Sequence, residues 1–364
     1  MSLLQQLEIL EDPRKDINKR HDLLDVVFLV LSAILSGASG WKSIQDFGDD
    51  QLEWLRQHRK FENGIPRRHC VANIIKALDS DLLLQAVMSW LNENRKSQSK
   101  TILAIDGKTL RGAWRENIQH ALHVVSAFDV DNGVSFYQGA TNRKGKEAKV
   151  VHEMLEVLTL KNTVVTLDAL HCQMKTMEKA IAAKGDFMIQ LKGNRQELKS
   201  AVDTVFEACN DISSKNKFLQ TTKGHGREEV RKVTQLRADF DKEVSQKWPH
   251  IKTIIRVETE RTLKGETAKS TRQYVSSLEL NPEEAAQIIR KHWAVENNLH
   301  WVLDVVFRED NLKVSDPDGA KHLALFNRVA LNIIKQHQGF KDSLAAKRRK
   351  AAWNQSFRSE LLMG

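Results

Sequence analysis

The chain has 364 residues, 41% hydrophobic and 28% charged, a balance that is typical of a globular protein and excludes a largely disordered one. Its 56 lysines and arginines against 47 aspartates and glutamates leave a net charge of +9, which favours a polyanionic partner such as nucleic acid over a merely basic housekeeping enzyme. The apolar run Val26–Leu35 is well short of the roughly 20 residues that a membrane-spanning helix needs, so no membrane partner is expected.

The cysteines and the N-terminus indicate the compartment. Cys70, Cys172 and Cys209 are widely separated and form no Cys-x-x-Cys pair, so neither a disulfide framework nor a structural zinc site is supported. The first residues lack the basic, apolar and small regions of a signal peptide. We expect a soluble cytoplasmic protein.

Residues 1–95 read as an all-α domain. Apolar and amphipathic segments with helical period follow one another at residues 22–37, 43–61, 69–78 and 82–95. The polar run NENRKSQSKT then marks a domain boundary.

Residues 96–340 change to an α/β pattern. Short strand-like runs occur at 101–108, 120–141 (a hairpin around Asp131-Asn132-Gly133), 162–169 and 186–192, and helical runs at 148–160 and 173–185. This order predicts a mixed sheet flanked by helices.

A different texture interrupts that pattern. Residues 213–280 alternate polar and apolar side chains and predict a β-rich insertion. A helix is expected at 281–307, with Pro282 near its start. Residues 341–364 form a basic tail, whose KRRK run is expected either to track phosphates or to be a solvated helix end.

Three acidic residues stand at informative places. Asp106 follows the apolar run ILAI and Asp168 follows VVTL, and carboxylates at strand ends of such sheets face the crevice where ligands bind. Glu296 lies beside the apolar stripe of the helix 281–307. Such a trio could share Mg²⁺ or Mn²⁺, and two ions would suit displacement at phosphorus. The alternatives are turn formers and a solvated glutamate.

A zinc site on the late helix is disfavoured. His292, Glu296 and His300 are spaced i, i+4, i+8, and the outer two lie roughly 12 Å apart along a helix axis. One tetrahedral ion does not reach all three.

Six segments in register resemble one family over nearly the whole chain: IDGKTLRG, VTLDALHCQ, FMIQLKGNRQEL, GHGREEVR, YVSSL and IRKHWAVENNLHWVLDVVFRED. They resemble the DDE-type transposases of bacterial insertion sequences, and most of all the H-repeat-associated branch that accompanies Rhs elements. The N-terminal DFGDDQLEWLRQHRKFENGIP is similar to the helical domain associated with these transposases.

The resemblance implies an RNase H-like fold with Asp106, Asp168 and Glu296 as catalytic acids that bind Mg²⁺ or Mn²⁺, two ions in all. It implies DNA strand cleavage and strand transfer at the element ends, with DNA as partner, a homodimer in the DNA complex and no small-molecule substrate. Nucleoid association follows from that partner. The chain departs from related motifs at Ile289, His292 and Leu303, which leaves the DNA contacts on the late helix open.

Eight residues are candidates for DNA contact, weighed against solvated surface or core packing: Lys108, Arg111, Lys192, Asn194, His225, Arg227, His292 and Trp293. Two other functions stay open at this point. One is an RNase H-like nuclease that cuts without joining, and the other is a domesticated DNA-binding protein that no longer performs chemistry.

Overall fold

The computed structural model describes residues 3–94, 100–110, 122–141, 146–209, 212–224, 226–311, 314 and 316–363. Two of the candidate DNA contacts, Arg111 and His225, lie outside these ranges. The chain forms two compact units. The first unit comprises Met1–Ser97, Gly107–Glu147 and Glu296–Gly364, and the second comprises Gln98–Asp106 and Ala148–Val295.

The strands of the described residues form one mixed sheet of nine, in the order β3-β2-β1-β4-β5-β9-β8-β7-β6. β4 is parallel to both β1 and β5, and β5 pairs antiparallel with β9, so the β-rich insertion extends the same sheet. The predicted mixed sheet and its insertion are confirmed. The strands are β1 Thr101–Leu110, β2 Leu122–Asp129, β3 Val134–Thr141, β4 Thr163–Leu167, β5 Asp186–Leu191, β6 Lys217–Gly224, β7 Arg227–Arg237, β8 Thr253–Leu263 and β9 Glu266–Ser276.

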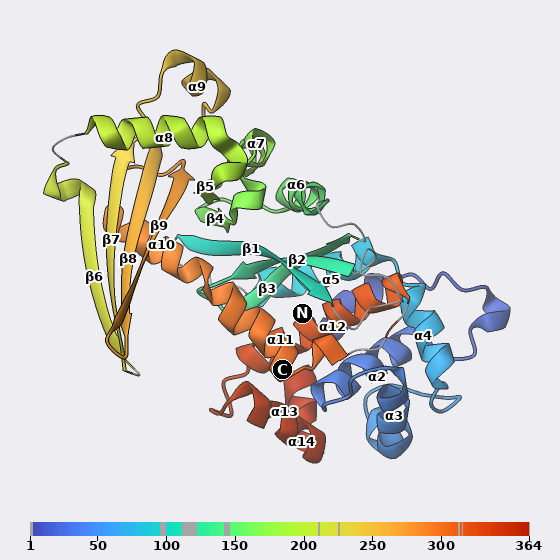
Figure 1. Ribbon diagram of the computed structural model, residues 1–364. Helices are drawn as coiled ribbons and strands as arrows, with labels where there is room; N and C mark the ends of the chain where they lie inside the picture. The colour runs from blue at the N-terminus through green and yellow to red at the C-terminus, as the bar shows by residue number, and fades with distance from the viewer. Residues whose placement is uncertain are drawn as a thin grey trace. The chain divides into compact units, whose positions relative to one another are not determined.

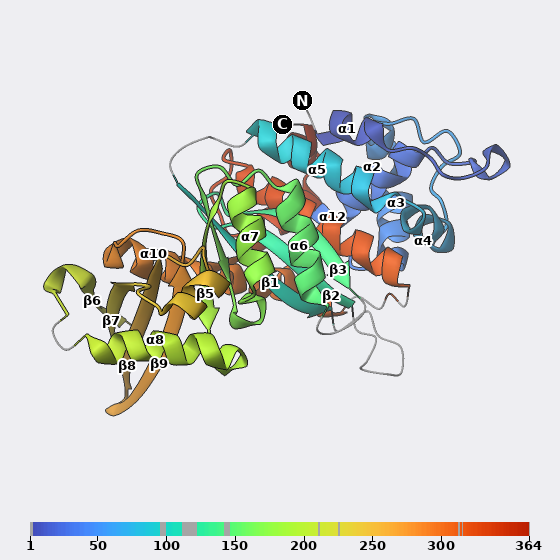
Figure 2. The same cartoon turned by 90° about the horizontal axis from the view of Figure 1, so that it is seen from above.

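Helices cover both faces of the strands in the second unit. In the two views of Figures 1 and 2, α6, α7 and α8 lie over one face and α10 lies over the opposite face. α10 packs against β4, β6 and β7. The helices are α6 Glu147–Val157, α7 Met174–Ala182, α8 Gln196–Ala208, the short α9 Lys242–Lys247 and α10 Pro282–His292.

The first unit contains the expected N-terminal helices and one long helix that we did not predict. The N-terminal helices are α1 Leu3–Gln6, α2 Leu23–Leu35, α3 Trp41–Arg56, α4 Arg68–Lys76 and α5 Ser80–Asn94. The unpredicted helix, α12 (Pro317–Gln336), is buried along most of its length and packs against β2, β3, α2 and α4. Asp316 caps its N-terminus by accepting from the Gly319 amide at 2.9 Å. Among the residues described, none of the helices is long and apolar enough to cross a membrane.

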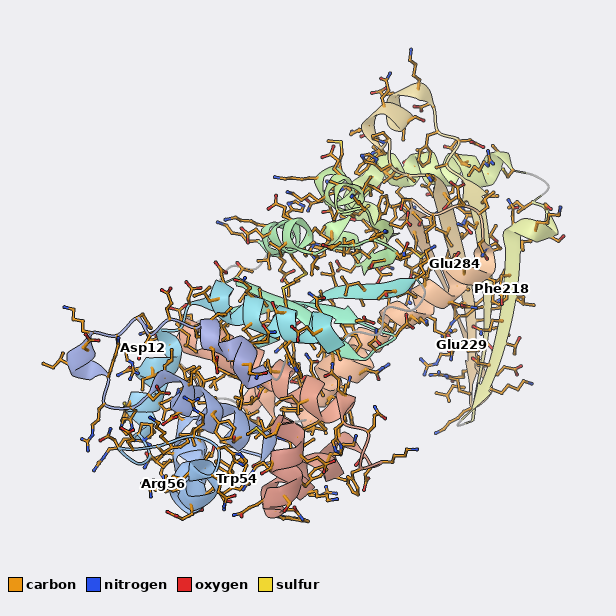
Figure 3. All side chains as sticks on the ribbon, turned by 180° about the vertical axis from the view of Figure 1, so that it is seen from behind. Asp12, Trp54, Arg56, Phe218, Glu229 and Glu284 are labelled. Atoms are coloured by element: carbon orange, nitrogen blue, oxygen red, sulfur yellow. The ribbon has the colours of Figure 1, made fainter. Side chains whose placement is uncertain are left out.

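The C-terminal residues are packed helices, so the expected basic tail is corrected. α13 (Leu344–Trp353) and α14 (Gln355–Met363) contact α2 and α12, and Trp54 of α3 lies beside them (Figure 3). Lys347 and Arg348 of the KRRK run are each 7% exposed. Both expectations for that run, phosphate tracking and a solvated helix end, are therefore wrong for these two residues.

The late helix predicted at residues 281–307 is interrupted. α10 ends at His292, a π-helical turn spans Glu296–His300, and α11 (Trp301–Val305) follows. Such turns are rare and often occur at functional sites.

Candidate active site

Asp106 and Asp168 stand at matching positions on two parallel strands. The register pairs Thr101 with Thr163 and continues to Ala104 with Thr166. Each aspartate comes two residues after that last pair. The residues before Asp106 in β1 are buried, as is β4 before Asp168. Asp168 follows the end of β4, but β1 continues past Asp106 to Leu110, so the expectation that Asp106 lies at a strand end is wrong.

The loop after β4 is held in place by hydrogen bonds. The Asp168 carboxylate accepts from the Leu170 amide at 3.1 Å and caps the short 3₁₀ turn Ala169–His171. The Asn194 amide donates to the Ala169 carbonyl at 2.7 Å. Asn194 was predicted as a phosphate contact, but this bond shows that its side chain also supports the loop that carries Asp168.

His292, at the end of α10, is tied to β4. Its Nδ1 lies 2.9 Å from the Thr166 hydroxyl, two residues before Asp168. Burial lowers the pKa of His292, although the Asp168 charge acts in the opposite direction. A neutral imidazole bonded to the sheet helps fix the end of β4. Its predicted phosphate contact stays a prediction.

Glu296 begins the π-helical turn and His300 ends it. The Glu296 side chain is 60% exposed, whereas the His300 side chain is 5% exposed, and its Nδ1 lies 3.1 Å from Glu296 Oε2. Within the first unit, Glu296 and His300 could each offer one ligand atom to a metal ion.

Lys108, predicted as a phosphate contact or a solvated residue, is buried in a charged cluster. Its ammonium pairs with Asp304, with Glu309 at 3.2 Å and with Asp310 at 3.4 Å. Glu309 also binds the Arg328 guanidinium at 2.8 Å. The solvated alternative is wrong, and a DNA contact by Lys108 stays a prediction that these ion pairs count against.

The pKa values in this cluster follow from its charges. Burial alone would lower the pKa of Lys108, but Glu309, Asp304 and Asp310 together hold it above its ordinary value. Burial would likewise raise the pKa of Glu309, but Arg328 and Lys108 lower it. Lys108 is therefore protonated and Glu309 ionised at neutral pH. Because alternate residues of a strand share a face, Lys108 fixes the segment of β1 that also carries Asp106.

A basic cavity of about 630 Å³ lies in the second unit, which we call the Trp293 cavity. Four cations line it: Lys192, Lys199, Arg256 and Arg272. The Trp293 ring is 47% exposed and the Arg272 guanidinium lies 5.0 Å from its centre. Asp203 offsets part of the charge, since it pairs with Lys199 at 2.7 Å and with Arg256 at 3.6 Å.

Arg227 is far from this cavity. The register connects Leu191 at the cavity to Thr234 through β9 and β8, and Arg227 lies seven residues further along β7. That separation is about 24 Å at the usual strand rise. Arg227 is 3.4 Å from Glu229, which Figure 3 labels on the same strand. Its predicted DNA contact would therefore belong to the outer end of the insertion.

Sequence reasoning missed two features of the site. It considered His300 only as a zinc ligand and overlooked that i, i+4 spacing brings it to Glu296. It also missed the cluster of Glu309 and Arg328, since Lys108 is distant from both in sequence.

Comparisons with known proteins identify the family of the chain. Residues 97–333 match the family described as "Transposase DDE domain", and residues 4–91 match the family described as "DDE_Tnp_1-associated". The "H repeat-associated putative transposase YhhI" of Escherichia coli K12 is 32% identical, over 100% of this chain and 98% of its own length. The "Putative transposase YncI" of Escherichia coli O157:H7 is 33% identical, over 99% of this chain and 94% of its own length.

Proposed function

Because the chain belongs to the DDE transposase family, we propose that it cleaves and joins DNA strands at the ends of an insertion sequence, using divalent cations held by Asp106, Asp168 and Glu296. The observation that carries the proposal is the matched position of Asp106 and Asp168 on adjacent parallel strands of the second unit. In the first unit, the exposed Glu296 carboxylate, bonded to the buried His300, supports its inclusion as the third acid.

The donor set fits Mg²⁺ or Mn²⁺. Three carboxylates offer hard oxygen ligands, which these cations prefer. Glu296 and Asp168 have side chains that are 60% and 45% exposed, so their oxygens are open to a ligand. When bound, two cations would supply positive charge to the attacking and leaving oxygens of an in-line displacement.

The proposed reaction has two balanced steps. In the first, a water oxygen forms a bond to phosphorus at the element end, and the 3′-oxygen leaves as a hydroxyl. In the second, that 3′-hydroxyl attacks a phosphate of target DNA and displaces the oxygen of the neighbouring nucleotide. The chain holds the carboxylates in place: the His292–Thr166 bond fixes the end of β4, and the ion pairs of Lys108 fix β1.

The Trp293 cavity is our proposed contact for a DNA strand beside the carboxylates. Lys192 and Arg272 would neutralise phosphates, and the exposed Trp293 ring offers a surface for a base. We retain Arg227, and also Arg111 and His225 outside the described residues, as further contacts. We further propose that two protomers act together on chromosomal DNA in the cytoplasm and that residues 1–95 help recognise the terminal repeats.

Cleavage of labelled DNA that carries the flanking element ends, with Mn²⁺, tests the chemistry. We expect the wild type to cut and Glu296→Gln to bind DNA without cutting, because glutamine keeps the volume but loses the charge. Glu360→Gln is the matched control, since Glu360 also pairs with a histidine, His337, at 2.8 Å. Equal cutting by the wild type and Glu296→Gln would remove Glu296 from the site.

Joining needs its own measurement. A supercoiled target plasmid added to the same reaction should acquire covalently joined element ends if strand transfer occurs. Nicked plasmid alone would support the nuclease reading, and binding without any cleavage would support the domesticated DNA-binding protein.

A further inference from the structure

The strongest unassigned feature is the buried histidine at the end of the π-helical turn. Leu299 and Leu303 on either side of His300 are fully buried, and His300 itself is 4% exposed. A buried, packed ring bonded to a largely exposed carboxylate restricts the motion of that carboxylate. Glutamate has much rotamer freedom to lose, so such a bond matters most where the carboxylate must hold one orientation.

The hydrogen bond defines the state of the imidazole. Because an ionised carboxylate only accepts, we assign the proton of the Nδ1···Oε2 pair to Nδ1. The buried ring therefore donates from Nδ1 to the largely exposed carboxylate of Glu296.

A single hydrogen-bond donor suits a carboxylate that binds a cation, because it fixes the carboxylate and leaves other oxygen lone pairs free for the ion. An imidazole that itself bound the cation would add nitrogen to an oxygen set, which favours transition metals over Mg²⁺. Carboxylates that bind metals are commonly held by hydrogen bonds from residues behind them.

We propose that His300 is the positioning residue of Glu296, fixing its carboxylate for a divalent cation through donation from Nδ1. The inference rests on the proposed function, since it assumes that Glu296 binds the cation. It adds a role for a residue outside the three acids.

Substitutions that separate the two ring nitrogens provide the test. In His300→Asn the amide nitrogen takes the place of Nδ1, in His300→Gln it takes the place of Nε2, and His300→Phe removes both. Mn²⁺ binding to the full-length chain, followed by the electron paramagnetic resonance signal of free Mn²⁺, gives dissociation constants without any activity assay. Thermal unfolding without metal checks that each variant folds.

We expect His300→Asn to bind Mn²⁺ nearly as well as the wild type and His300→Gln and His300→Phe to bind about 10- to 100-fold more weakly. His337→Phe is the matched control, because it breaks another His–Glu pair of the first unit and should leave Mn²⁺ affinity unchanged. Wild-type affinity in His300→Phe would overturn the proposal. Rescue by glutamine and not by asparagine would also overturn it.

The proposed cation site and the proposed role of His300 would be contradicted by different results. Should the wild type not bind Mn²⁺, or should Glu296→Gln bind it equally well, then the proposed cation site is wrong. If Glu296→Gln loses Mn²⁺ while every His300 variant keeps it, the cation site stands and the role of His300 is wrong. The comparison of asparagine with glutamine remains informative even if His300→Phe does not fold.

Discussion

The basic residues of the two units differ in exposure: some in the first unit are buried in packing contacts, and some in the second line an open cavity. In the first unit Arg328, Arg348 and Arg358 are at most 7% exposed, and their guanidinium groups bond to acceptors inside the protein. In the second unit Lys192 and Arg272 line an open cavity beside an exposed tryptophan. The net charge of +9 therefore overstates the charge available to DNA, and the run with the densest positive charge in the sequence is partly a packing element.

The contacts explain the difference. The Arg348 guanidinium donates to the carbonyls of Ile34, at 3.0 Å, and Val306. Arg358 lies over the Trp54 ring at 4.0 Å. Arginine covers apolar surface with its aliphatic stem and bonds several acceptors with its planar guanidinium group, which makes it suitable for a buried position between helices.

The largest expected effect comes from the buried pair of Glu309 and Arg328. Glu309→Gln keeps the shape but leaves the Arg328 charge, 1% exposed, without its carboxylate. We expect a loss of about 3–5 kcal/mol in the free energy of unfolding. Urea denaturation at neutral pH measures it. Glu260→Gln, which breaks the exposed pair with Lys269, is the control and should change little.

Neighbouring arginines of α13 sharpen the comparison. Arg348→Ala leaves buried carbonyls without a donor and should cost about 2–3 kcal/mol. Arg349→Ala, one residue on and exposed, should stay within about 0.5 kcal/mol of the wild type. Both free energies come from the same denaturation experiment. Equal losses in the two variants would mean that the basic run acts through its overall charge and not through the buried contacts.

The sequence predicted much of the fold because the relevant signals are local. Alternating β-branched residues located the strands between Thr101 and Ser276, and helical periods located the helices between them. α12 was not predicted, although Asp316 and Pro317 are good signals for the start of a helix. The π-helical turn has no comparable signal, because HWAVENNLHW reads as one continuous helix.

The candidate site was less predictable, for a physical reason. Whether a lysine or arginine is buried depends on carboxylates supplied by distant segments. Lys108 meets Glu309, 201 residues away in sequence, and neither residue alone indicates the pair. Asp106 and Asp168 could be singled out because each follows a short apolar run, which is a local feature, but their hydrogen-bonding partners required the three-dimensional structure.

The exposed residues of the Trp293 cavity are tested by DNA binding. Trp293→Ala should weaken binding of a single-stranded oligonucleotide by about 1–3 kcal/mol, the usual value of one stacked base. Fluorescence anisotropy measures the affinity. Trp353, 80% exposed on α13, provides the control: Trp353→Ala should bind as the wild type does. A similar loss in both variants would mean that exposed tryptophans bind the strand without regard to the cavity.

The smallest expected effect separates a phosphate contact from a merely basic neighbourhood. If Lys192 neutralises one phosphate, Lys192→Ala should lower the slope of log affinity against log salt by about 0.7 for a single strand, because one fewer counterion is released. The wild type and the variant should then converge in affinity as salt increases. Arg349→Ala should keep the wild-type slope, since Arg349 belongs to α13 and is not among the residues that line the cavity. An unchanged slope in Lys192→Ala would mean that Lys192, like the buried arginines of the first unit, does not neutralise a phosphate of the DNA.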